Sequence, residues 1–95
     1  MNTILAIDQS TSATKALLFT LSGELIDKTS LEHQQYYPQP GWVEHDAEEI
    51  YRNTIAVINS LLVKYAERID DLLCLSITNQ RETIVIFDRA TGAPL

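Results

Sequence analysis

The chain has 95 residues but only one cysteine, three glycines and three prolines, and its apolar runs are no longer than a short strand. One cysteine cannot form an internal disulfide, so we expect a reducing compartment, the cytoplasm. We expect Cys74, within an apolar run, to be a small buried hydrophobic side chain. No stretch approaches the ~20 apolar residues that cross a bilayer. Because Asp8 interrupts the first apolar run, which no basic segment precedes, we expect no signal peptide.

Positive charge is also scarce. Seven basic against thirteen acidic residues give a formal net charge of −6 at pH 7. This balance argues against nucleic acid or an anionic membrane as a partner. There is no internal repeat, low-complexity tract or linker, and the length allows one domain at most.

Apolar runs bounded by turn residues predict five strands, at residues 3–8, 14–20, 24–31, 72–77 and 84–87. Prolines and a glycine predict a loop over 36–42, and residues 89–92 predict a turn. With one helix between the third and fourth strands, the order is βββαββ. This order favours an α/β fold of the α+β-like kind, a mixed sheet with a helix on one face.

The helix is predicted between Asp46 and Arg68. Asp46 is an N-cap candidate, and Glu49, three residues later, completes a capping-box pattern. Apolar residues then recur at helical spacing, which predicts a face that packs on the sheet. This face comprises Ile50, Thr54, Val57, Ile58, Leu61 and Tyr65.

A hydroxyl-rich turn joins the first two predicted strands, over residues 9–15, directly after Asp8. Backbone N–H groups and hydroxyls in such a turn can bind phosphate. Asp8 can hold Mg²⁺, which takes one or two carboxylates plus water, and Lys15 can neutralise phosphate charge. The alternative is a polar hairpin turn without a ligand, since no G-x-x-x-x-G-K-[ST] sequence is present.

A second candidate site follows the strand predicted at 72–77, where Arg81 and Glu82 lie at its carboxyl end. Ligands gather at the carboxyl ends of strands in open α/β sheets. An Arg–Glu pair offers five rigid donors and several acceptor sites, which suits adjacent hydroxyl groups. The alternative is a surface ion pair, worth ~0–1 kcal/mol.

Three other side chains have both a functional and a structural interpretation. Trp42 can be a wall of a substrate pocket, but we expect it to anchor its loop by burial. His45 lies between two acids without the spacing of a metal site, so we expect a hydrogen bond near the helix start. We expect His33 to face solvent.

Three motifs together resemble the FGGY carbohydrate kinases, and among them the start of the glycerol kinases. They are residues 8–12 (DQSTS), 37–46 (YPQPGWVEHD) and 78–83 (TNQRET), in the family's order and spacing. The resemblance covers essentially the whole chain. It implies a ribonuclease H-like, actin-like ATPase lobe, of which residues 1–95 are the N-terminal portion, with the rest of the kinase absent.

The resemblance implies ATP, Mg²⁺ and a small polyol or sugar as ligands, and a homo-oligomer for the full-length protein. Asp8 would lie near the metal, and Arg81 and Glu82 would hydrogen-bond the polyol hydroxyls. The residues implied to contact ATP phosphates are Asp8, Thr11, Ser12 and Lys15. The general base is expected downstream, so no catalytic residue is assigned and the isolated chain is expected to be inactive.

The sequence departs from the family pattern at three positions. Ser10 replaces a glycine that exploits positive φ, Ala13 replaces a hydroxyl residue, and Lys15 replaces an arginine, whose planar fork it cannot reproduce. These departures leave three alternatives open. They are a kinase for a pentulose or another sugar, an actin-like nucleotide-binding module without a polyol acceptor, and a non-catalytic piece that binds neither ligand.

Overall fold

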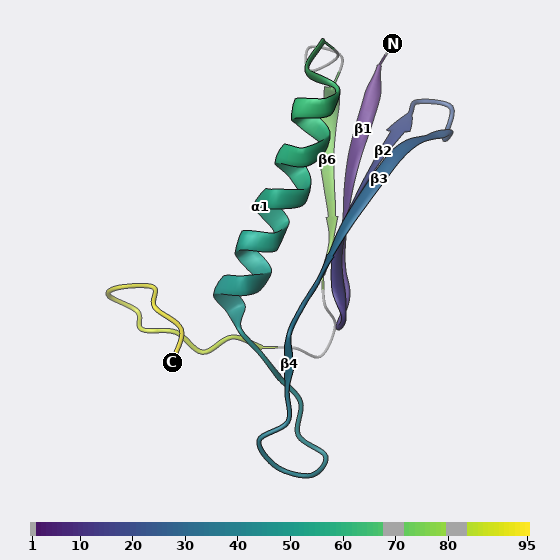
Figure 1. Cartoon of the computed structure of the whole chain (residues 1–95). Helices are drawn as coiled ribbons and strands as arrows, with labels where there is room; N and C mark the ends of the chain where they lie inside the picture. Colours follow the sequence, from purple (N-terminus) through teal and green to yellow (C-terminus); the bar gives the residue numbers. More distant parts are fainter. Residues whose placement is uncertain (1, 68–71, 80–83) are drawn as a thin grey trace.

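The computed structural model describes residues 2–67, 72–79 and 84–95. Four strands form the main sheet in the order β3-β2-β1-β6. Their bounds are β1 Thr3–Gln9, β2 Ala13–Thr20, β3 Leu25–Glu32 and β6 Leu72–Thr78. β1 pairs antiparallel with β2, and β2 with β3, whereas β6 lies parallel to β1 (Figure 1). The sheet is therefore mixed, as the sequence predicted.

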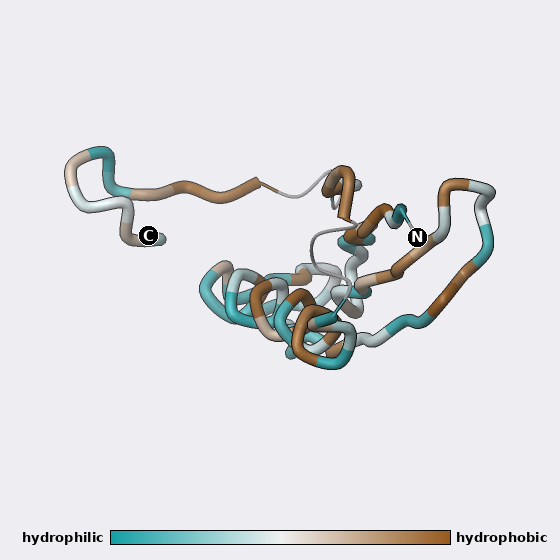
Figure 2. The backbone as a smooth tube through the Cα atoms, turned by 90° about the horizontal axis from the view of Figure 1, so that it is seen from above, coloured by the Kyte–Doolittle hydropathy of each residue, from teal (hydrophilic) through white to brown (hydrophobic). Residues whose placement is uncertain are grey.

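Helix α1 (Ala47–Lys64) packs on one face of this sheet (Figure 2). The predicted helix face is confirmed, because Val57 and Leu61 are buried against alternate residues of β1 and β2. Alternation along a strand places every second side chain on the same face. The buried core consists of Leu5, Ile7, Ala16, Leu18, Val57 and Leu61.

The ends of α1 differ from prediction. The Asp46 side chain caps the helix by accepting from the Glu48 N–H at 3.0 Å. Glu49 does not complete a box with this cap, because its Oε1 accepts from the Gln34 N–H at 2.7 Å. The helix ends at Lys64, earlier than the predicted Arg68, since Tyr65 leaves helical geometry with φ −113° and ψ 36°.

The last turn of α1 is tied to β3 through Asp27. Its Oδ2 accepts from Lys64 Nζ at 2.7 Å and from the Tyr65 hydroxyl at 2.8 Å. These two hydrogen bonds, with one from the Lys28 N–H, lower the pKa of Asp27 to about 2. A carboxylate held this way keeps the charge that the bonds need.

The predicted order βββαββ is wrong in two places. The first is a small antiparallel pair, β4 (Gln35–Tyr36) and β5 (Glu44–His45), which sequence patterns missed because two-residue strands carry no periodicity. The loop between them is present as predicted, with Gly41 at φ 84°. Trp42 does not anchor it by burial, since 54% of the side chain is exposed.

The second error is residues 84–87, which do not form a sheet strand. This segment runs away from the sheet and turns back on itself (Figure 1), so it lacks the neighbour that a strand needs. Its partners lie in the chain's last residues instead: Phe87 bridges Pro94, and the Leu95 N–H donates to Ile86 O at 2.8 Å. The predicted turn at 89–92 closes this fold-back, with Asp88 accepting from two turn N–H groups.

β6 is more exposed than an apolar strand predicts. Cys74 is exposed, so the prediction that it is buried is wrong. The reason is that α1 packs over β2 and β3, while β6 is at the edge of the sheet and carries exposed apolar side chains such as Leu73 and Ile77. Within the described ranges, no helix has the length and apolarity to cross a membrane.

Candidate functional site

Polar side chains from three strands meet at the carboxyl end of β1. Because β1 and β6 are parallel, their carboxyl ends share one edge of the sheet, and Asp8 is the register partner of Thr78. On its other side, Asp8 is the register partner of Lys15 in β2. Ile7 is buried in the core beneath α1, and side chains alternate along a strand. The side chains of Asp8 and its two partners therefore project from the face opposite the helix.

The Asp8 carboxylate is exposed and oriented by one neighbour. The Thr78 hydroxyl donates to Asp8 Oδ1 at 3.2 Å and also lies 3.4 Å from the Ile7 carbonyl oxygen. Among residues 2–67, 72–79 and 84–95, no donor bonds to Oδ2. In that part of the chain no three His, Cys, Asp or Glu side chains form a metal-binding group. A cation at Asp8 would take one carboxylate from this part of the chain.

Ser10 closes the turn between β1 and β2. Its N–H and its hydroxyl both donate to the Ala13 carbonyl oxygen at 3.0 Å, and its Oγ accepts from the Ala13 N–H at 3.3 Å. A short polar side chain that bonds its own turn in this way stabilises the turn locally. Ser10 therefore stabilises the turn, at a position where the FGGY pattern that the sequence resembles has glycine.

The tip of the turn is Thr11 and Ser12, and both residues are exposed. The Thr11 carbonyl oxygen accepts from His45 Nε2 at 2.8 Å, and the Ser12 carbonyl oxygen accepts from the His33 N–H at 2.8 Å. We expected a hydrogen bond of His45 near the helix start, and the structure shows one with the hairpin tip. β5 and the segment after β3 hold the tip from the helix side.

His33 is buried, with 7% of its surface exposed, so the prediction that it faces solvent is wrong. Its Nδ1 lies 3.1 Å from Asn53 Nδ2, and its Nε2 lies 3.0 Å from Thr14 Oγ1. An amide nitrogen only donates, so Nδ1 is the acceptor and Nε2 carries the hydrogen. Burial lowers the pKa of His33, against an opposing effect of the Glu49 carboxylate.

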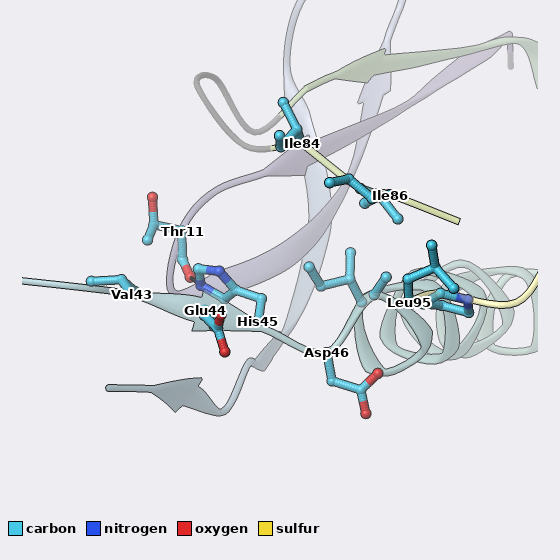
Figure 3. A pocket seen from close by; sticks show the side chains of 12 residues that line it. Thr11, Val43, Glu44, His45, Asp46, Ile84, Ile86 and Leu95 are labelled. Atoms are coloured by element: carbon cyan, nitrogen blue, oxygen red, sulfur yellow. Dashed lines mark hydrogen bonds between the residues drawn. The ribbon is translucent and has the colours of Figure 1, made fainter. Parts of the chain in front are cut away.

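Arg81 and Glu82 lie outside the described residues. The segment that follows them borders a cavity of about 610 Å³ next to the hairpin tip (Figure 3). Thr11, His45 and Ile84 line different walls of this cavity. The hairpin tip and the chain just after Arg81 and Glu82 therefore face a common space.

Sequence patterns identified the hairpin but missed what holds it. Asp8, Thr11, Ser12 and Lys15 stood out because hydroxyls and charges cluster between two apolar runs. His33 and Asn53 carried no signal, because they are 20 residues apart and meet only when α1 packs on the sheet. His33 follows the polar end of a strand, where no periodic apolar pattern predicts which side chains are buried.

The sequence of this chain is similar to those of several known proteins. Residues 3–95 match the family described as the FGGY family of carbohydrate kinases, N-terminal domain. Glycerol kinase 1 of Thermotoga maritima is 45% identical over 92 residues, which cover 97% of this chain and 19% of that protein. The glycerol kinase of Pseudarthrobacter chlorophenolicus is 47% identical over 92 residues, covering 97% and 18%. The chain therefore spans about a fifth of the length of the curated relatives it matches.

Solved structures of the same family share the arrangement described above. The crystal structure of Plasmodium falciparum glycerol kinase with ADP aligns with a TM-score of 0.85 and 41% identity, covering all of this chain (100%) and 19% of that one. Xylulose kinase from Rhodospirillum rubrum aligns with a TM-score of 0.86 and 26% identity, covering 99% and 19%. The α/β fold is thus the actin-like, ribonuclease H-like ATPase type. With a family match that runs from β1 to the last residue, this chain belongs to the FGGY carbohydrate kinases.

Proposed function

We propose that residues 1–95 form the first part of an ATP-dependent polyol kinase, most similar to a glycerol kinase, which transfers the γ-phosphate of ATP to a primary hydroxyl group. The observation that carries this proposal is the parallel pairing of β1 with β6. It brings the hydroxyl-rich hairpin to the same sheet edge as the strand that leads into Arg81 and Glu82. Phosphoryl transfer depends mainly on holding donor and acceptor together and on stabilising charge, and this topology supports both.

The hairpin would bind the phosphates of ATP. Thr11 and Ser12 offer hydroxyls and backbone N–H groups at the tip, and Lys15 offers a positive charge on the same face as Asp8. Asp8 fits Mg²⁺, which takes one or two carboxylates together with phosphate oxygens and water. When bound there, Mg²⁺ would neutralise charge on the phosphates.

The acceptor would bind at the carboxyl end of β6. A guanidinium has five donors in a fixed fork and a carboxylate accepts on two oxygens, so Arg81 and Glu82 suit neighbouring hydroxyls of a polyol. The general base would come from the remaining part of the kinase. We therefore expect the isolated chain to form no ADP in a glycerol-dependent reaction.

The proposal also covers the location and assembly of the protein. Cys74 is an exposed free thiol, and such thiols are kept reduced in the cytoplasm, which is the location we propose. A homo-oligomer for the full-length protein rests on the family resemblance alone.

The test uses an intact kinase that begins with residues 1–95, either the native full-length protein or a chimera that joins them to the remaining domains of the Thermotoga maritima relative. ADP release is measured with glycerol, erythritol, D-xylulose and L-ribulose. Arg81→Ala is compared with Arg89→Ala, a matched change in the exposed C-terminal turn. We expect turnover on glycerol that Arg81→Ala abolishes and Arg89→Ala leaves intact.

Two other outcomes have definite meanings. Turnover on a pentulose but not on glycerol would mean that the substrate is a sugar, while the kinase reaction of the family stands. Ser10, Ala13 and Lys15 would then be features that distinguish a sugar kinase from a glycerol kinase. ATP hydrolysis that no acceptor stimulates would contradict the kinase and favour a nucleotide-binding module.

A further inference from the structure

At the tip of the hydroxyl-rich hairpin, the carbonyl oxygens of Thr11 and Ser12 each accept a hydrogen bond from a residue outside the hairpin. His45 Nε2 bonds Thr11 O and the His33 N–H bonds Ser12 O, each at 2.8 Å. A carbonyl oxygen only accepts, so His45 carries its hydrogen on Nε2. The two donors come from β5 and from the residue just after β3, which are distant in sequence from the hairpin.

This arrangement affects the opposite side of each peptide unit. In a trans peptide the C=O of one residue and the N–H of the next point in opposite directions. Holding Thr11 O toward the protein therefore turns the Ser12 N–H outward, as in the backbone nests that bind anions. Opposite Ser12 O, the Ala13 N–H donates to Ser10 Oγ at 3.3 Å. Within the described ranges, the Ser12 N–H donates no hydrogen bond. The Ser12 N–H is therefore available at the exposed tip.

A chain of hydrogen bonds connects the same hairpin to α1. Asn53 Nδ2 donates to His33 Nδ1, and His33 Nε2 donates to Thr14 Oγ1. The Thr14 hydroxyl donates to Gln9 Oε1 at 2.7 Å, and Gln9 Nε2 donates to Thr54 Oγ1 back on α1. The series starts and ends on α1, and each of its four hydrogen bonds has one donor and one acceptor. Because satisfied polar networks are rigid, this series holds the base of the hairpin to α1.

We propose that His45, supported by His33, is a positioning residue that orients the Ser12 N–H toward the terminal phosphate of the nucleotide. The inference deepens the proposed function and rests on it, since it assigns the tip to the γ-phosphate. His45 itself is bonded to the carbonyl side of the tip and would not touch the nucleotide.

The test measures nucleotide affinity directly in the intact kinase, by calorimetric titration with the β,γ-imido analogue of ATP and with ADP, both with Mg²⁺. In His45→Phe the ring volume is kept but the donor to Thr11 O is lost. We expect the Kd of the ATP analogue to rise about tenfold, the effect of one hydrogen bond to a charged group. The Kd of ADP, which lacks the γ-phosphate, should change by less than about twofold.

His45→Gln provides the rescue, because its amide nitrogen can donate to the same carbonyl. We expect it to recover most of the lost affinity, while Glu44→Gln, the neighbour on β5, leaves both affinities unchanged. If His45→Phe does not fold, His45→Asn, whose side chain is too short to reach, carries the same prediction. Equal loss of affinity for both nucleotides, no loss, or no rescue by glutamine would overturn the inference.

The experiments distinguish a failure of the positioning role of His45 from a failure of the proposed kinase function. Tenfold-weaker analogue binding in a protein that turns over no acceptor would support the positioning role and contradict the polyol kinase. Full acceptor turnover with unchanged analogue affinity in His45→Phe would leave the kinase standing and remove the positioning role. If the wild-type protein binds neither nucleotide, both are wrong.

Discussion

At the scale of single residues, a buried imidazole is costly to charge, and His33 lies where only its neutral form fits. A proton on Nδ1 would face the Asn53 amide nitrogen, which is itself a donor and also donates to Glu32 O at 3.2 Å. Burial lowers the pKa of His33, and nearby His45 acts in the same direction, whereas Glu49 raises it. The hydrogen-bond chain is therefore complete only while His33 is neutral.

This predicts a pH dependence of stability. Because the folded pKa lies below the unfolded value of about 6.5, the unfolded chain binds the proton first as pH falls. The free energy of unfolding should therefore decrease below about pH 6.5, until the pH reaches the folded pKa. Urea titrations of the chain at pH 7.5 and 5.5 measure the decrease. His33→Phe should decrease less over that interval, and an equal decrease in both proteins would contradict the assignment.

At the scale of elements, α1 is stabilised by a narrow apolar face. Leu61 is 2% exposed in the core, whereas Val63, two residues away on the same helix, is 77% exposed. Only residues spaced by three or four positions share the face that packs on the sheet. Stability should therefore depend strongly on one of these two side chains and weakly on the other.

Truncating each of them to alanine tests that difference. Leu61→Ala should lower the free energy of unfolding by about 2–5 kcal/mol, because it removes buried methyl groups and leaves a cavity. Val63→Ala should stay within about 0.5 kcal/mol of the parent, as surface changes do. Denaturant unfolding followed by circular dichroism gives both values. Similar losses for the two variants would mean that α1 does not pack as described.

At the scale of the whole molecule, the sheet has an uncovered edge. β6 pairs only with β1 among the described strands, and Leu73, Leu75 and Ile77 on it are 55%, 48% and 60% exposed. An exposed apolar edge strand is a template for pairing with another chain.

We therefore expect the 95-residue chain to self-associate. Sedimentation at increasing concentration should show dimers or larger species. Leu75→Lys should reduce association by placing a charge on the edge strand, whereas Val63→Lys on the exposed side of α1 should not. A monomer at high concentration in the unmodified chain would contradict the expectation.

The three strands before α1 that belong to the main sheet, the helix itself and β6 could be predicted because their causes are local. Residues 3–20 contain two apolar runs around one polar turn, and residues 47–64 repeat apolar groups at helical spacing, so each segment carries its own signal. Asp8, Thr11, Ser12 and Lys15 could be selected for the same reason. Residues 84–87 show the limit: their composition favours a strand, but a strand also needs a neighbour.

The sequence by itself determined the hydroxyl-rich turn, the helix with its Asp46 cap, and the family. Only the tertiary structure decided that β6 lies parallel to β1, that Cys74 and Trp42 are exposed, and that His33 is buried. Burial and hydrogen-bond partners depend on which surfaces meet after the chain folds back over tens of residues. A local sequence pattern shows which face of a helix or strand is apolar, but not which other element will pack against that face.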